Sequence, residues 1–348
     1  GGACVDTRVD PDHCGACGHR CNDTRCDEGL CVPGEVGTIS GGAGNVHVHG
    51  DFAYWMVRLD RGGTVLRVRL ADLPRATAAV VAASDAAGLV WNSLQATARG
   101  LYWLDRQGAS LTRVLFLPWA SAEKDGPPEA PQQVFAAGDG ESVPRFAASD
   151  EYLFLFLTGP NNLRRLVRVT VADGTTLMGG RPGTTECGSG DMLADGTGVY
   201  CFAVLPSSPT RVATLRRFES PPVPGTAWQS APVDVGVLLD PGGIRRDGTS
   251  VLVLGTNALL RVGSGPPSAV RTFDPPGQGP NVGLAADADA FYVTREQGSL
   301  LYRIPRQGDE PPLLVAKAPI TGREMRVATT PEWILFTGGD GRLFFLRR

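Results

Sequence analysis

Eight cysteines, four histidines and a scattered set of carboxylates are the residues of this chain that could do chemistry. Six of the cysteines lie near its start, at Cys4, Cys14, Cys17, Cys21, Cys26 and Cys31. A segment this short, polar and rich in Cys cannot bury a hydrophobic core, so it needs covalent cross-links or a metal ion. Six thiols can be fully paired as disulfides, although the spacing leaves the pairing open. We therefore expect a disulfide module over residues 1–33 and an oxidising compartment, which means a secreted protein or the outer cell surface.

A metal site is the rival interpretation of the same residues. The segment 13–21 reads His-Cys-Gly-Ala-Cys-Gly-His-Arg-Cys, with a Cys-x-x-Cys step and two His, as in a zinc knuckle. A structural zinc ion would use only part of this ligand set, so disulfides are favoured and no metal is assigned. A lipid anchor on Cys4 is a further idea, based only on the small residues Gly2 and Ala3 that precede it.

The remaining cysteines, Cys187 and Cys201, flank one expected hairpin. A local disulfide is the default for such a pair in an oxidising compartment. The simple hairpin register places Cys201 nearer to Met192, which leaves this disulfide less certain than those of the module.

The ring histidines, His47 and His49, alternate with Val46 and Val48 on a strand-like segment, so both imidazoles point to the same side. A hydrogen-bonded polar layer is favoured there over a metal pair. No His-Glu-x-x-His, Gly-x-Ser-x-Gly, phosphate-binding P-loop or EF-hand pattern occurs in the sequence. Nothing in these motifs indicates catalysis.

A repeated unit of short strands must position these residues. The clearest copy runs from Gly100 to Asp105, and equivalents of Tyr102 follow a turn at Tyr54, Leu153, Tyr200, Leu252, Tyr292 and Ile334. A later strand of six units carries an Arg: Arg67, Arg113, Arg168, Arg217, Arg261 and Arg303. A period of about 40–50 residues built from short strands predicts an all-β, seven-bladed β-propeller.

The repeat also predicts the domain organisation. We expect the propeller to span residues 34–348, with an N-terminal strand at 35–40 closing the last blade, because the seventh unit ends at its third strand. The aromatic positions should fill the layers between blades. Each repeated Arg should lie along its blade, covering apolar surface with its methylenes and reaching a carboxylate or backbone with its head group.

Composition excludes two classes of partner. A net charge of −3 provides no broad basic face, so no nucleic acid is expected. No apolar run approaches the ~18 residues that a membrane-spanning helix needs, so no transmembrane segment is expected.

Candidate binding residues lie where the first strands begin, at the mouth of the expected channel. Together with the two ring histidines these are Asn45, His47, His49, Asn92, Arg145, Asp191, Asp240, Asn281 and Glu324. Their carboxylates and amides could hold Ca²⁺, although solvated loop residues are favoured and no cofactor is assigned. Two Pro-rich inserts, 117–133 and 220–231, carry Trp119 and Trp228 as candidate exposed anchors for a partner.

Two resemblances follow from these residues. The segment from Cys4 to Gly18, with its Asp-Pro-Asp-His-Cys-Gly-Ala-Cys-Gly run, resembles a Cys-rich module of secreted proteins from myxobacteria and related bacteria. Leu-Tyr-Trp-Leu-Asp at 101–105, followed by Leu-Thr-Arg-Val at 111–114, resembles YWTD-type propellers. Those relatives are usually six-bladed, which keeps six blades as the alternative. The resemblance implies recognition of a protein or a glycan at a cell surface, with lyases and hydrolases on related frames.

The sequence therefore favours an extracellular or cell-surface binding and scaffold protein that is not an enzyme. One alternative is a propeller lyase or hydrolase with an acidic, Ca²⁺-binding channel mouth. Another is an accessory subunit of a larger extracellular assembly, which would need an apolar surface around Trp119 or Trp228.

Overall fold

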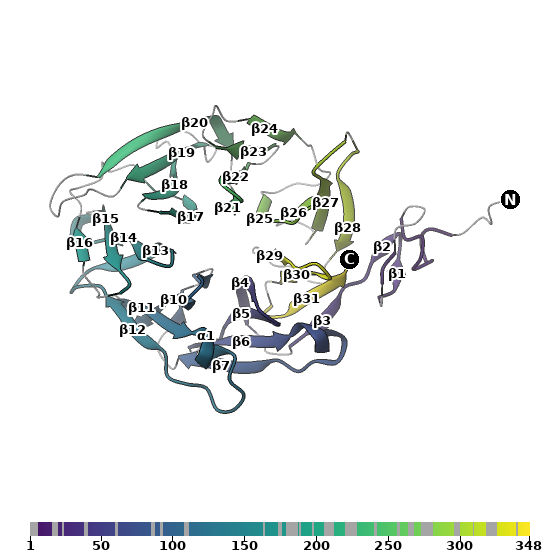
Figure 1. Ribbon diagram of the computed structural model, residues 1–348, viewed down its shortest axis with the longest axis horizontal. Helices are drawn as coiled ribbons and strands as arrows, with labels where there is room; N and C mark the ends of the chain where they lie inside the picture. The colour runs from purple at the N-terminus through teal and green to yellow at the C-terminus, as the bar shows by residue number, and fades with distance from the viewer. Residues whose placement is uncertain are drawn as a thin grey trace. The chain divides into compact units, whose positions relative to one another are not determined.

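Seven β-sheets account for almost all regular structure in the computed structural model of this chain (Figure 1). The structure describes residues 6–15, 20–22, 24–37, 41–59, 62–84, 88–90, 93–107, 111–162, 164–172, 176–178, 187, 189–196, 198–204, 212–219, 228–239, 242–255, 258–263, 268–272, 281–295, 300–308, 310–317, 326–338 and 340–348. The arrangement is that of an all-β, seven-bladed β-propeller, which confirms the fold predicted from the repeat and excludes the six-bladed alternative. The described helices are short: η1 (Leu70–Arg75), α1 (Trp119–Ala122) and η2 (Pro160–Asn162). None of them is long and apolar enough to cross a membrane.

The chain divides into two compact units. Unit 1 comprises Gly1–Val57, Leu66–Ala79 and Phe273–Arg348, and unit 2 comprises Arg58–Val65 and Val80–Thr272. One sheet has strands in both ranges, in the order β4 (Gly42–His49), β5 (Phe52–Arg58), β6 (Gly63–Arg69) and β7 (Ala79–Ser84).

Unit 2 contains four complete sheets that follow one another along the chain, with β13, β17 and β21 at the same edge of their sheets (Figure 1). Their strands are β8 (Gly88–Leu89), β9 (Gln95–Ala96), β10 (Gly100–Gln107), β11 (Leu111–Pro118) and β12 (Gln132–Ala136); β13 (Ser142–Ala148), β14 (Tyr152–Thr158), β15 (Arg164–Thr170) and β16 (Thr176–Met178); β17 (Ser189–Asp195), β18 (Gly198–Val204), β19 (Val212–Glu219) and β20 (Gln229–Leu239); β21 (Gly243–Asp247), β22 (Ser250–Leu254), β23 (Ala258–Val262) and β24 (Ser268–Thr272).

Unit 1 contains the last two sheets and the Cys-rich segment. Their strands are β25 (Asn281–Ala286), β26 (Ala290–Arg295), β27 (Leu300–Pro305) and β28 (Leu313–Lys317), extended by β2 (Leu30–Cys31) and β1 (Cys26–Asp27); and β29 (Val327–Thr329), β30 (Trp333–Thr337), β31 (Leu343–Arg347) and β3 (Gly34–Val36). Every pairing is antiparallel except that of β2 with β28.

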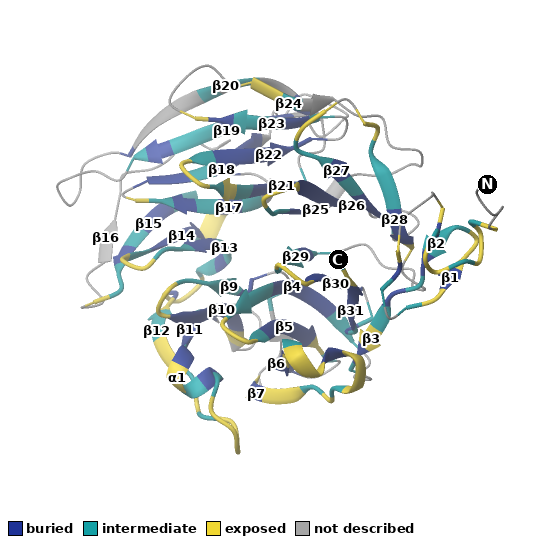
Figure 2. Ribbon diagram, turned by 45° about the vertical axis from the view of Figure 1, so that its right-hand side comes forward, coloured by how far each residue is buried: buried dark blue, intermediate teal, exposed yellow. Residues whose placement is uncertain are grey.

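The second strands β14, β26 and β30 are buried along nearly their whole length, as expected for strands covered on both faces (Figure 2). Leu153, Phe154 and Leu155 on β14 are each fully buried. One hydrophobic cluster joins Tyr102 and Phe116 of one sheet to Leu153 of the next, and similar clusters join the later sheets of unit 2. Such layers stabilise by about 1.5–3 kcal/mol per large side chain. The aromatic positions of the repeat are therefore core positions, as predicted.

Hairpin chemistry follows the predicted turns. Asp195 pairs with Gly198 and Asp247 pairs with Ser250, so two residues close each hairpin. The first of them is Gly196 or Gly248, with φ of 56° and 59°. An added Cβ would meet nothing within 4 Å at either position, so backbone conformation rather than space requires glycine there.

The repeated Arg keeps its register in only part of the fold. In three sheets it lies directly opposite the residue used for alignment, as Arg217–Tyr200, Arg261–Leu252 and Arg303–Tyr292. Arg168 is opposite Phe154, one position beyond the aligned Leu153. Arg113 is opposite Asp105, and Phe116 occupies the place opposite Tyr102. In the unit whose repeat is clearest in the sequence, Arg113 thus lies nearer the β10–β11 turn than Tyr102 does, because this hairpin is longer.

Strand β3 forms the outer edge of the last sheet. Gly34 lies opposite Phe345 and Val36 opposite Leu343 on β31. A Cβ at Gly34 would run into the Phe345 ring, so this pairing needs glycine. The predicted domain boundary at residues 33 and 34 stays a prediction.

The Cys-rich segment packs on the sheet formed by β25–β28. Cys31 pairs in parallel with Ala316, and Asn22 Nδ2 donates a hydrogen bond of 2.7 Å to the Arg348 carbonyl. The described module cysteines, Cys14, Cys21, Cys26 and Cys31, share one hydrophobic cluster with Tyr292 and Phe336. The segment is therefore part of the core of unit 1.

Candidate functional site

Four of the predicted channel-mouth residues lie on first strands in unit 1. Asn45, His47 and His49 are on β4, where the Asn45 side chain is buried and both imidazoles are half-buried. Asn281 begins β25, and only its backbone is described. Three further predicted residues lie outside the described part of the chain: Asn92, Asp240 and Glu324. A common mouth formed by this set stays a prediction.

The structure brings the two predicted residues of unit 2 together. Arg145 on β13 and Asp191 on β17 lie on the first strands of neighbouring sheets and interact electrostatically. Arg245, on the first strand β21 of the next sheet, donates from Nη1 to Asp191 Oδ2 at 2.9 Å and to the Ile244 carbonyl at 2.8 Å. Sequence reasoning did not assign Arg245 to the site. Its place on a predicted first strand, beside those of Arg145 and Asp191, was the available signal.

Burial determines the electrostatics of this cluster. Removal from water lowers the pKa of the Arg145 guanidinium, the Asp191 carboxylate opposes that shift, and the positive charge of Arg164 adds to it. Guanidinium groups outnumber carboxylates here, so the cluster suits an anion. The Ca²⁺ hypothesis fits it poorly, because Asp191 is already held by Arg245.

Carboxylates at the hairpins between first and second strands bind the repeated Arg residues. Asp195 accepts from Arg217 at 3.2 Å, and Asp247 accepts from Arg261 at 3.0 Å. Arg246 reaches Asp195 from the next sheet, so this carboxylate also links two blades. Unit 1 has a similar link between neighbouring sheets. Arg348, which follows β31 and is not one of the repeated Arg, has its Nη2 3.2 Å from Asp287 and 3.1 Å from Asp289 at the β25–β26 hairpin. These contacts support the structural interpretation of the repeated Arg.

Asp105 is the most enclosed of the carboxylates. Its side chain is fully buried, accepts from Arg113 Nε at 2.7 Å and Nη2 at 2.6 Å, and accepts from Ser84 Oγ at 2.6 Å. Both Arg113 groups contact the same oxygen, Oδ2, while Oδ1 accepts from Ser84, and charge-assisted hydrogen bonds of this kind are short and strong. Both carboxylate oxygens accept hydrogen bonds from other residues of the fold. Asp105 is therefore unsuited to acid–base chemistry on a substrate.

The two Trp residues predicted as exposed anchors are buried. Trp119 is 8% exposed, begins α1 and donates from Nε1 to the Thr97 carbonyl at 2.9 Å. Trp228 is 9% exposed and packs edge-on against Phe154, with ring centroids 6.1 Å apart. The exposed-anchor prediction is wrong for both, because Trp119 is fixed by its hydrogen bond to Thr97 and Trp228 belongs to the buried cluster that contains Phe154. This burial counts against the assembly hypothesis.

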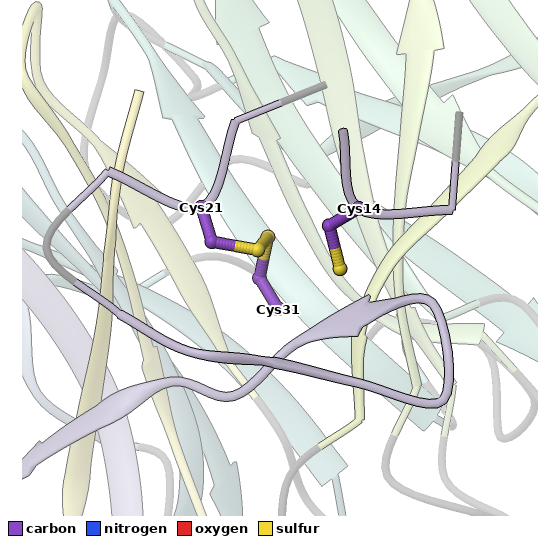
Figure 3. Close-up of side chains that lie close together, drawn as sticks. All are labelled: Cys14, Cys21 and Cys31. Atoms are coloured by element: carbon purple, nitrogen blue, oxygen red, sulfur yellow. A yellow bond between two sulfur atoms is a disulfide. The ribbon is translucent and has the colours of Figure 1, made fainter. Parts of the chain in front are cut away.

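Four of the six module cysteines form disulfides, as predicted for them. Cys14 bonds to Cys26 and Cys21 to Cys31, while Cys4 and Cys17 lie outside the described residues. The sulfur atoms of Cys14, Cys21 and Cys31 lie within 4.8 Å of one another (Figure 3), so this group differs from the Cys-x-x-Cys pattern with two His that suggested a metal site in the sequence. Disulfide bonding accounts for these sulfurs, and it indicates an oxidising environment.

The local disulfide between Cys187 and Cys201 is also present. Cys201 lies opposite Met192, as the hairpin register predicted, and Cys187 reaches it from before β17 with a φ of 62°. Both sulfurs belong to the cluster between two sheets of unit 2.

We expect stability to fall at alkaline pH partly through Tyr102. Burial raises the pKa of Tyr102 to about 12, and its hydroxyl has no hydrogen-bond partner within the described residues. The unfolded chain would ionise near its ordinary value of 10.0. The contribution of neutral Tyr102 is thus fully present below that pH and lost as pH rises toward the folded value.

Tyr102→Phe should therefore be neutral or slightly stabilising at neutral pH, since no hydrogen bond is lost. Urea midpoints of both proteins between about pH 8 and pH 11 test this, and the variant should lose less stability over that interval. Parallel pH profiles for the two proteins would contradict it.

Comparisons with known proteins add the fold class only. No family model matches the chain, and no curated protein matches its sequence. Among solved structures, virginiamycin B lyase from Staphylococcus aureus is similar with a TM-score of 0.60 and 10% identity, covering 88% of this chain and 95% of that one. A computationally designed protein (TM-score 0.56, 8% identity, 90% and 98% covered) and a chain of the Mitotic Checkpoint Complex (0.54, 12%, 88% and 89%) are also similar. At these identities the chain shares an architecture with enzymes and non-enzymes alike.

Proposed function

We propose that this protein is a secreted or cell-surface binding and scaffold protein that recognises a protein or a glycan without chemical turnover. The proposal includes two relationships. The Cys-rich segment is related to modules of secreted bacterial proteins, and the blades are related to YWTD-type propellers. The disulfides support an extracellular location.

The observation that carries the proposal is that carboxylates of the blades are held in structural ion pairs. Within the described part of unit 2, the carboxylates of Asp105 on β10 and of Asp191, Asp195 and Asp247 on first strands are each held by a guanidinium group. A lyase or hydrolase needs a base or acid that can exchange protons with a substrate. Carboxylates locked in ion pairs favour a rigid frame on which the non-repeated residues bind.

This function is tested by a binding screen in which each bound ligand is then examined for chemical change. The oxidised full chain is applied to an array of defined glycans and to immobilised secreted proteins from its source, with reduced and alkylated protein as the matched control. We expect saturable binding of the oxidised form to at least one ligand, which mass spectrometry recovers unchanged. Cleaved or unsaturated ligand would establish the enzyme alternative, and failure to bind any of them would contradict the proposal.

A further inference from the structure

Arg145 and Arg164 are half-buried arginines of unit 2 that form no hydrogen bond or ion pair through their guanidinium groups with any described residue. Arg145 lies on β13, and Arg164 lies at the start of β15, from where its charge acts on Arg145. Six other arginines of the same unit are ion-paired: Arg113, Arg165, Arg217, Arg245, Arg246 and Arg261.

The local charge does not balance. Asp191 is the carboxylate that attracts Arg145, but it lies 2.9 Å from Arg245 and is already matched by it. Glu141, just before β13, is bound by Arg165 at 2.7 Å. Among the described residues, no carboxylate is therefore hydrogen-bonded to Arg145 or Arg164, and Asp191 offsets the charge of Arg145 only in part.

The backbone is irregular at the same place. The pairing of β13 with β14 shifts register between Ser142 and Arg145, and that of β17 with β18 shifts between Ser189 and Met192, around Asp191. Bulges of this kind redirect side chains and are common beside binding sites. Both neighbouring first strands thus depart from regular pairing where the charged residues sit.

A half-buried cation without a partner is destabilising, because it loses hydration and gains no hydrogen bond in return. Such a group persists when it has another use, and guanidinium groups match the geometry of carboxylate and phosphate oxygens. We propose that Arg145 and Arg164 form an oxyanion-binding site beside the Asp191–Arg245 ion pair. The inference rests on the proposed binding function and gives its ligand a negatively charged group.

The ligand chemistry is a small oxyanion, and its two sources are a sugar carboxylate and a phosphate. Partial burial strengthens the attraction relative to a fully exposed site. Arg145 supplies the directional hydrogen bonds, Arg164 adds charge, and the Asp191–Arg245 pair holds the neighbouring strand in place. A neutral sugar offers no partner for either cation.

The first test separates a binding role from a structural one. Arg145→Met keeps the apolar stem and removes the unpaired charge, so the urea midpoint should stay unchanged or rise. Arg261→Met, which removes the partner of Asp247, is the matched comparison and should lower it. A clear fall for Arg145→Met would overturn the proposal, because it would show that the fold depends on this cation.

The second test measures binding by calorimetry at low salt with glucuronate, glucose 6-phosphate, inorganic phosphate and glucose as probes. We expect at least one anion to bind and glucose not to bind. Arg145→Gln should weaken that binding about 10-fold or more, since a charge-assisted hydrogen bond is lost. Arg75→Gln, an equal change of charge at an exposed position, should bind as the wild type does.

The outcomes separate this site from the wider function. Preference for glucuronate over both phosphates identifies the carboxylate, and the reverse identifies the phosphate. Absence of anion binding, or equal binding by Arg145→Gln and wild type, rejects the site even if the glycan and protein screen succeeds. Anion binding that requires Arg145 supports the site even if that screen finds no ligand.

Discussion

The double substitution Cys21→Ala with Cys31→Ala should destabilise the β-sheets of unit 1 as well as the module itself. Cys21 and Cys31 are 1% and 4% exposed and share a hydrophobic cluster with Phe336 and Ala316. Loss of a disulfide typically removes about 2–4 kcal/mol, and the loss of core packing adds to that here. We expect a matching fall in the free energy of unfolding.

Tryptophan fluorescence makes this measurement specific. None of the six Trp residues precedes Trp55, so the signal in a urea titration comes from outside the module. Val9→Ala is the control, because Val9 is 61% exposed in the same segment and should leave the midpoint unchanged. A module that loses its disulfide without moving the tryptophan transition would be an independent domain, contrary to this prediction.

The substitution Asp105→Ala should have the largest effect of any single charge removal in unit 2. It would remove from Arg113, whose side chain is only 23% exposed, the oxygen that both its Nε and Nη2 groups contact, and from Ser84 one hydrogen-bond acceptor. Breaking a buried ion pair from one side costs about 3–5 kcal/mol, and the partial exposure of Arg113 favours the lower end. Urea unfolding should show a correspondingly lower midpoint.

A double-mutant cycle isolates the cause. Asp105→Ala combined with Arg113→Ala should be less destabilising than the sum of the single changes, because neither charge is then left unpaired. Lys124→Ala, which breaks the exposed pair with Glu129, is the control and should be without measurable effect. Additive losses at Asp105 and Arg113 would mean that the pair is not coupled.

The repeat predicted the architecture well because local strand patterns decide it. Tyr102 and Leu153 were expected between blades and are found there. The register of Arg113 could not be obtained in this way, because β10 and β11 are longer than their counterparts and the extra residues shift the pairing. Aligning the repeats predicts which residues face each other across a hairpin only where the hairpins have equal lengths.

The candidate site was predicted less completely. Arg145 and Asp191 were selected from their place before first strands, yet the link to Arg245 depends on the spacing of two sheets. Trp119 and Trp228 were misjudged because Pro-rich inserts suggested exposed loops, whereas α1 and β20 fold the indoles back against the sheets. Long-range packing is the information that a single sequence lacks.

The pairing of β2 with β28 has a consequence for the order of assembly. Cys31 reaches its neighbour Ala316 only after nearly the whole chain has emerged, which takes on the order of tens of seconds at usual synthesis rates. Contacts so distant in sequence also form slowly. In an oxidising compartment, the thiols near the N-terminus would be open to disulfide exchange until β28 is in place. Burial of Cys21 and Cys31 beside Ala316 then protects the finished disulfide from exchange.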